Sequence, residues 1–195
     1  MDYYPLTICG ITRKLPLIQI GRKTKIASFS ILGDAELVDK IATQMAKKLK
    51  RVDFDYLVGP EVKVVPLLQS LSEKLGKKRF IVCRKSAKQY MISPIILLPL
   101  SHFPKHSHPL VINGEDVKLL KNKKVVIIDD VVSTGITLRM VNKLMTDANA
   151  KIVTRLAVIK QGNQFDKNLK FDYLSTLPII KDKHPIDTPI EKPIR

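Results

Sequence analysis

The chain of 195 residues has few cysteines and no long apolar run, and each shortage excludes a class of protein. Its two cysteines, Cys9 and Cys83, have neither the spacing of zinc ligands nor that of a redox pair, so we expect a reducing, cytoplasmic setting. The most apolar stretch, residues 91–100, contains two prolines and falls short of the about 18 residues that span a membrane. The N-terminal sequence MDYYPLTICG lacks the basic start and apolar run of a secretion signal. We therefore expect neither export nor a membrane partner.

Acidic residues are also scarce, since 18 Asp and Glu stand against 34 Lys and Arg and leave a net charge of +16. This charge suits a nucleic acid, an anionic surface or a phosphate-rich small substrate, and it equally suits a solvated lysine-rich surface. The hydrophobic content of 45% is typical of a globular protein. At this length we expect a single domain, over residues 1–181, followed by a loosely held tail over residues 182–195.

The pattern of apolar residues predicts strands that alternate with helices. The predicted strands cover residues 25–32, 55–58, 79–83, 125–128 and 152–159. Three helices are predicted. The first begins at the N-cap Asp34, the second follows the turn 59–63 and ends at Gly76, and the third begins at Ile136. This order indicates an α/β fold with a mostly parallel sheet flanked by helices. Ligands of such sheets bind beyond the carboxyl ends of the strands, where the turns after Val58, Cys83 and Ile128 should converge.

Residues 84–118 interrupt this alternation with a basic start, four prolines and three of the four histidines. A segment of this length without regular structure is often functional, so we expect a flexible loop or a hairpin. Its histidines, His102, His106 and His108, have no carboxylate near them in the sequence, which argues against a metal site.

The most informative stretch is VVIIDDVVSTGITL, residues 125–138. Two carboxylates, Asp129 and Asp130, end a buried strand, and a turn of small hydroxylated residues then opens a helix. The free N–H groups at a helix start and the positive end of its dipole make such a turn a cradle for an anion. The two acids suit the hydroxyls of a sugar or a divalent cation rather than the phosphate itself. A phosphorylated ribose satisfies both halves of the turn.

Other phosphate-binding signatures, GxxxxGK[ST] and GxGxxG, do not occur in the sequence. The run 125–138 resembles the motif with which type I phosphoribosyltransferases bind phosphoribosyl pyrophosphate (PRPP). The resemblance implies that Asp129 and Asp130 bind the ribose hydroxyls and approach Mg²⁺ only through PRPP and water. It also implies that the 5′-phosphate is held by the following five residues, Ser133, Thr134, Gly135, Ile136 and Thr137. The alternative is a solvated strand end followed by an ordinary turn.

Two further segments resemble the same family, so the likeness covers most of residues 11–178. GPEVK, residues 59–63, stands where these enzymes have their pyrophosphate loop, which implies PRPP contacts from Glu61 and Lys63. RKSAKQYM, residues 84–91, resembles the adenine- and xanthine-specific members. There the resemblance implies that three basic residues bind pyrophosphate, one of them across a homodimer interface: Arg84, Lys85 and Lys88. Surface lysines and a solvated strand end are the alternatives.

The resemblance also implies a fold and a reaction. The fold is a twisted, mostly parallel sheet with a flexible loop and a small hood region. The reaction displaces pyrophosphate from PRPP by a purine base and forms a nucleoside monophosphate. Mg²⁺, the basic residues and the acid pair would stabilise the charge that develops, with Asp129, Asp130 and Lys85 as the catalytic set. The resemblance thus implies that the anionic ligand suited by the positive net charge is a small sugar phosphate, and we expect no nucleic-acid partner.

The choice of base depends on weaker signals. Hypoxanthine-guanine enzymes carry an aspartate at the place of Ser133, and a serine cannot replace it as an acid or base, which favours adenine over these two bases. Xanthine enzymes also carry a small residue there, so Ser133 does not separate adenine from xanthine. The region 160–181 instead resembles the base site of oxopurine enzymes, and the Glu-Tyr-Gly of many adenine enzymes is missing from the loop. The candidate base contacts are Val131, Lys160, Phe171 and Tyr173. We interpret the chain as an adenine phosphoribosyltransferase. The alternatives are an enzyme for xanthine, guanine or hypoxanthine and a non-catalytic regulator that binds PRPP or a nucleotide.

The double substitution Asp129→Asn with Asp130→Asn tests the motif. We expect PRPP turnover to collapse, because the neutral amides no longer provide the carboxylate acceptors for the ribose hydroxyls, while the fold stays intact. Turnover assays and circular dichroism on the same preparation measure both. Near-normal turnover in the double variant would contradict the assignment of the PRPP site to this turn.

Overall fold

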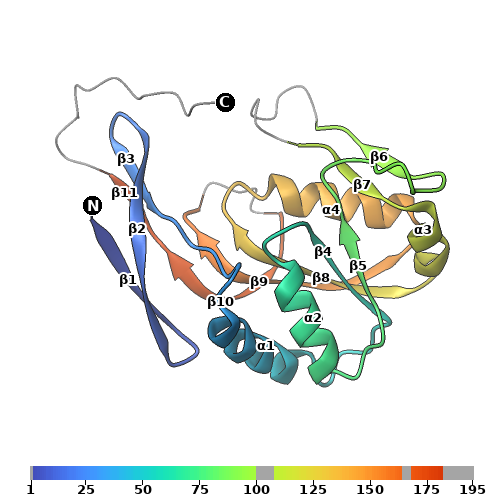
Figure 1. Ribbon diagram of the computed structural model, residues 1–195, viewed down its shortest axis with the longest axis horizontal. Coiled ribbons are helices and arrows are strands. Elements are labelled where there is room, and N and C mark those ends of the chain that lie inside the picture. The colour runs from blue at the N-terminus through green and yellow to red at the C-terminus, as the bar shows by residue number, and fades with distance from the viewer. Residues whose placement is uncertain (1, 100–107, 164–167, 182–195) are drawn as a thin grey trace.

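A sheet of five parallel strands forms the centre of the protein in the computed structural model, which describes residues 2–99, 108–163 and 168–181 (Figure 1). The strand order is β10-β9-β8-β4-β5. The bounds are β4 Tyr56–Pro60, β5 Phe80–Cys83, β8 Lys124–Val132, β9 Lys151–Gln161 and β10 Asp172–Leu177. Because all four pairings are parallel, the carboxyl ends of these strands lie at one edge. The predicted α/β class and parallel sheet are confirmed.

Helices cover both faces of this sheet. Successive side chains of β8 point to opposite faces, and because they are apolar on both, each face needs a covering layer. Val126 and Ile128 join the core beneath α1 (Ala35–Leu49) and α2 (Val65–Lys74). Val125 and Ile127 join the core beneath α4 (Ile136–Asp147), on the other side (Figure 1). The apolar positions predicted for the first helix are the ones it buries: Leu37, Val38, Ile41, Ala42, Met45 and Leu49. Among the described residues, no helix has the length and apolar character needed to cross a membrane.

A second, antiparallel sheet lies beside the first and corresponds to the small hood region that the resemblance implies (Figure 1). Its order is β1-β2-β3-β11, with bounds Tyr3–Ile8, Ile11–Gly21, Thr24–Ala27 and Ile179–Lys181. The predicted strand 25–32 is therefore too long, because β3 ends at Ala27. The alternation of Phe29 and Ile31 with serines reflects the burial of these two side chains in the core, and it does not reflect strand pairing.

The irregular segment 84–118 contains a hairpin, which is one of the two structures expected from the sequence. Its strands, β6 (Ile95–Leu97) and β7 (Leu110–Ile112), pair antiparallel, and residues 100–107, between them in the sequence, lie outside the described residues. The loop prediction extends too far at its end, because α3 (Gly114–Leu120) begins within it. The predicted tail, residues 182–195, also lies outside the described residues.

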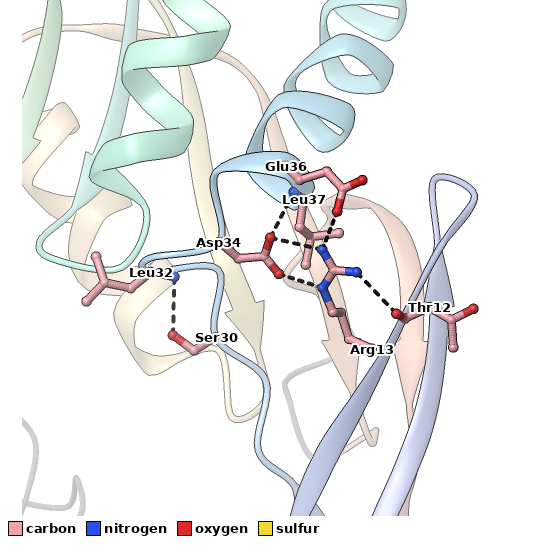
Figure 2. A network of polar contacts seen from close by, with 7 residues as sticks. All are labelled: Thr12, Arg13, Ser30, Leu32, Asp34, Glu36 and Leu37. Carbon is pink, nitrogen blue, oxygen red and sulfur yellow. Dashed lines mark hydrogen bonds and ion pairs between the residues drawn. The ribbon is translucent and has the colours of Figure 1, made fainter.

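An arginine joins the second sheet to the first helix. The Nε of Arg13, on β2, donates to Asp34 Oδ2 at 2.8 Å, and its Nη2 donates to Glu36 Oε2 at 2.7 Å (Figure 2). The other oxygen of Asp34 accepts the N–H of Leu37 at 3.1 Å, so Asp34 is the N-cap that the sequence predicts. The hydrogen bonds from Arg13 lower the pKa of Asp34. One carboxylate thus starts α1 and anchors β2.

Substitutions of Asp34 separate these two tasks. Asp34→Ala loses both the cap and the ion pair, and we expect it to cost about 1–2 kcal/mol at pH 7, or a few °C in Tm. Asp34→Asn keeps an oxygen that can cap α1 and should cost roughly half as much. Thermal melts measure the difference. Glu115→Ala, which removes an exposed ion pair with Lys118 and one of two acids in the first turn of α3, serves as the control and should lower Tm much less than Asp34→Ala.

The pH dependence gives the sign of the ion-pair contribution. Because the folded state lowers the pKa of Asp34, the stabilisation is complete above about pH 5 and is lost as the pH falls through the lowered value. The difference between the wild type and Asp34→Asn should therefore vanish in acid. A difference that grew as the pH fell would contradict this assignment.

Candidate active site

The two predicted acids lie at the carboxyl end of the central strand. They stand within β8 rather than after it, because β8 continues to Val132 and pairs with β9 as far as Lys160. Asp129 is only 5% exposed, and its Oδ1 accepts the N–H of Asp130 at 2.9 Å. The backbone of the next residue thus holds the buried carboxylate in place.

Burial dominates the electrostatics of this acid pair. It raises the pKa of Asp129 well above the ordinary value, and the charge of Asp130 raises that pKa further. Burial also raises the pKa of Asp130, and the charge of Lys63 opposes this shift most strongly. Lys63 belongs to the turn after β4, the strand next to β8. The pair therefore depends on a cation from the neighbouring strand end, and hydroxyl donors from a ligand would stabilise its charged form.

The turn after β8 has the geometry of an anion cradle. Gly135 adopts φ +76° at the N-cap of α4, a conformation that favours glycine, and it has no side chain with which to cap this helix. A ligand can therefore accept from the first N–H groups of α4, at the positive end of the helix dipole, without competing with an N-cap side chain. The side chains of Ser133, Thr134 and Thr137 face a cavity at this point.

One cavity of about 410 Å³ collects most of the predicted site residues from three strand ends. The turn after β4 contributes Glu61 and Lys63, and the end of β5 contributes Lys85. The remaining predicted lining residues come from β8 and the start of α4: Asp129, Asp130, Val131, Ser133, Thr134, Ile136 and Thr137. Gly135 lines a small adjoining cavity. The convergence predicted from parallel strand ends is confirmed.

The cavity also has lining residues that the sequence reasoning missed. His108 comes from the segment before β7, and Met140 comes from the first turns of α4. The spacing of Met140 indicated only a core position. His108 was considered only as a metal ligand, and its partners in that idea, His102 and His106, lie outside the described residues.

Two predicted pyrophosphate contacts are not among the residues that line this cavity. Arg84 Nη1 donates to the hydroxyl of Tyr90 at 2.8 Å, and Arg84 Nε lies 3.2 Å from Glu61 Oε2. Lys88 Nζ donates to Ser86 Oγ at 2.8 Å. Their roles stay predictions.

The predicted base contacts divide between two cavities. Val131 lines the cavity of the acid pair, whereas Lys160, Phe171 and Tyr173 line a separate one of about 430 Å³. There Lys160 Nζ lies 5.4 Å from the centre of the Tyr173 ring. The register gives the reason for the separation: Tyr173 on β10 pairs with Ala157 on β9, which pairs with Asp129 on β8, so Tyr173 lies level with the acid pair but two strands away. Base binding by these three residues stays a prediction.

The residues present fit a metal ion that arrives with its ligand. Within the part of the chain that the structure describes, no three His, Cys, Asp or Glu side chains come together as a metal site. Mg²⁺ in enzymes is commonly held by one or two carboxylates together with substrate phosphates and water. Asp129 and Asp130 supply such carboxylates beside the anion cradle.

The fold and this cavity together define an α/β protein with a candidate site at the carboxyl edge of a parallel sheet, where an acid pair, lysines and a helix start meet. A family model described as "Phosphoribosyl transferase domain" matches residues 30–190. The chain belongs to this family and is a phosphoribosyltransferase.

Relatives with several base specificities resemble the chain. The adenine phosphoribosyltransferase of Thermosipho africanus (strain TCF52B) is 31% identical over 79% of this chain and 81% of its own length. The orotate phosphoribosyltransferase of Archaeoglobus fulgidus is 27% identical over 71% of this chain and 68% of its own length. The crystal structure of the adenine phosphoribosyltransferase of Thermoanaerobacter pseudethanolicus superposes with a TM-score of 0.65 at 22% identity. It covers 83% of this chain and 93% of that one, and it supports the fold.

The raised pKa of Asp129 leads to a prediction about stability. Keeping this carboxylate charged in the folded state costs free energy above its raised pKa, so Asp129→Asn should stabilise the protein by on the order of 1 kcal/mol at pH 8. The gain should shrink as the pH falls through the raised pKa, because the wild-type carboxyl then becomes neutral as well. Thermal melts of both proteins at several values between roughly pH 4 and pH 8 measure this difference in stability.

Asp53→Asn is the matched control, because this exposed carboxylate pairs with Lys124 and its pKa is lowered. It should bring no gain in stability at any pH. An Asp129→Asn variant less stable than the wild type throughout the range would contradict the cost assigned to the buried charge.

Proposed function

We propose that the protein transfers the phosphoribosyl group of PRPP to adenine and releases AMP and pyrophosphate. The observation that carries the proposal is the single cavity in which the acid pair meets the phosphate cradle and two lysines from neighbouring strand ends. Ser133 in this cavity and the adenine-specific relative at 31% identity support adenine as the base. The product places the enzyme in purine salvage.

The residues divide into three tasks in this proposal. The first N–H groups of α4 and the hydroxyls of Ser133 and Thr137 hold the 5′-phosphate. Asp129 and Asp130 accept hydrogen bonds from the ribose hydroxyls, which also stabilises their charged forms. Lys63 and Lys85, both exposed to the cavity, bind the pyrophosphate.

The reaction is a displacement at the anomeric carbon. The bond between this carbon and the pyrophosphate oxygen breaks, pyrophosphate leaves with the electron pair, and a nitrogen of adenine bonds to the carbon and gives its proton to water. Positive charge develops on the ribose and negative charge on the leaving group. Lys63 and Lys85 stabilise the negative charge, and the acid pair stabilises the positive one, in a preorganised site.

Mg²⁺ is the proposed cofactor, held by PRPP and through water by Asp129 and Asp130. When bound, it would neutralise part of the pyrophosphate charge. The burial of the two carboxylates supports this arrangement, because a cation nearby favours their charged forms.

Two properties of the working enzyme are also proposals. We expect a homodimer in which a basic residue of segment 84–88 reaches the pyrophosphate of the partner subunit. Lys88 is exposed on its own subunit, which leaves it available for this role. We expect a cytoplasmic setting, which suits the two free thiols of Cys9 and Cys83.

An oxopurine is the second candidate base. The observation in its favour is the stacked arrangement of Lys160 over Tyr173, next to Phe171 at a ring distance of 6.1 Å. This set offers an aromatic face and a donor for a base oxygen. Its location in a separate cavity argues for the adenine reading.

A base panel tests the proposal. We expect PRPP with Mg²⁺ to be converted with adenine at least about tenfold more efficiently, in kcat/KM, than with hypoxanthine, guanine, xanthine, uracil or orotate, a ratio that corresponds to about 1.4 kcal/mol. Spectrophotometric assays of each base measure it, and chelation of Mg²⁺ should stop turnover. Preference for an oxopurine would replace the adenine assignment. No turnover with any base would favour a regulator that binds PRPP without catalysis.

A further inference from the structure

The geometry points to a positioning role for Glu61, which we infer holds Arg84 and the backbone of Lys85 so that the Lys85 side chain can bind pyrophosphate, rather than contacting PRPP itself. The inference rests on the proposed function and assigns to Glu61 a different task from the direct contact that the resemblance implies. It concerns the junction of two strand ends, β4 and β5, where the pyrophosphate would lie.

Three contacts hold Glu61 against the end of β5. Its backbone N–H donates to the carbonyl of Cys83 at 2.8 Å, which continues the pairing of β4 with β5 by one residue. Its side-chain Oε1 accepts the backbone N–H of Lys85 at 2.7 Å. Its other carboxylate oxygen, Oε2, lies 3.2 Å from Arg84 Nε. One oxygen of this carboxylate thus accepts a hydrogen bond from Lys85, and the other forms an ion pair, without hydrogen-bond geometry, with Arg84.

Arg84 is held from the opposite side as well. Its backbone exchanges two hydrogen bonds of 2.7 Å with Val111 on β7, and its Nη1 donates to the hydroxyl of Tyr90. Glu61 thus joins the turn after β4 to a segment that is itself fixed to the hairpin of β6 and β7. The first residue beyond that fixed point is Lys85, whose side chain lines the cavity.

A carboxylate in this cavity needs an explanation, because an unpaired negative charge would repel pyrophosphate. Glu61 lines the cavity, yet its side chain is only 19% exposed. Its charge is offset by the Arg84 guanidinium and by the Lys85 N–H. Lys63 and Lys85, in contrast, are exposed to the cavity. Two cations are thus exposed to the cavity, and the one carboxylate of the loop is paired with residues of the neighbouring strand end.

Removing the side chain should loosen Lys85 without removing a ligand contact. We expect Glu61→Ala to raise the KM for PRPP about tenfold, the scale of one hydrogen bond to a charged group, with kcat changed less than about threefold. Glu61→Gln keeps an oxygen that accepts the Lys85 N–H, so we expect it to recover most of that loss. Glu73→Ala, which removes an exposed carboxylate of α2 bonded to Gln69, is the matched control and should behave as the wild type.

A double-mutant cycle tests whether Glu61 acts through Lys85. Lys85→Ala should raise the KM for PRPP by itself, and Glu61→Ala should add little in that background, because the side chain it positions is already gone. Thermal melts of every variant confirm that the compared proteins are folded. Should Glu61→Ala not fold, the same comparison is made with Glu61→Gln against Glu61→Asp, whose shorter side chain cannot span the same contacts.

Each contrary result has a distinct meaning. Additive effects of Glu61→Ala and Lys85→Ala would overturn the positioning role, and so would a Glu61→Gln variant as impaired as Glu61→Ala, which would indicate a direct charge contact with the metal or the ligand. A Glu61→Ala variant equal to the wild type would overturn it as well. If the wild type fails to convert PRPP with any of the tested bases, the proposed function is contradicted instead. The wild type is therefore assayed before the variants are compared.

Discussion

A buried carboxylate, Asp129, next to a half-buried one, Asp130, at the end of the central strand is the constraint on which the site depends. Asp129 and Asp130 cost free energy in the folded state, and only partners nearby can offset that cost. The Asp130 N–H and Lys63 supply part of the compensation. The remainder is left for the hydroxyls and cation of a ligand. A protein that maximised stability would not keep this pair, so its presence supports a binding task.

The rest of the fold holds this pair in relation to its cations. The parallel order of β8, β4 and β5 brings three strand ends to one edge, and short turns then place Lys63 and Lys85 around one cavity. Helix α4 directs its positive end to the same place. Arg13 and Asp34 join the second sheet to α1, which packs beneath the same strands. Stability therefore resides away from the cavity, in the core and in this ion pair.

Local patterns were predictable from the sequence, and contacts between distant segments were not. The six buried positions of α1, the N-cap Asp34 and the cradle from Ser133 to Thr137 each lie within one continuous stretch. The second sheet pairs β3 with β11 from opposite ends of the chain, which no local period reveals. For the same reason the sequence did not separate Lys160 and Tyr173 from the acid pair, or join Glu61 to Lys85.

Binding of two sugar phosphates tests the central claim most directly, since it requires neither a base nor turnover. Calorimetric titration compares ribose 5-phosphate with 2-deoxyribose 5-phosphate, which lacks one of the two hydroxyls from which the acid pair would accept hydrogen bonds. We expect ribose 5-phosphate to bind about tenfold more tightly, the scale of one hydrogen bond to a carboxylate. Equal affinities for the two compounds, or no binding of either, would contradict the assignment of this cavity to a phosphorylated ribose.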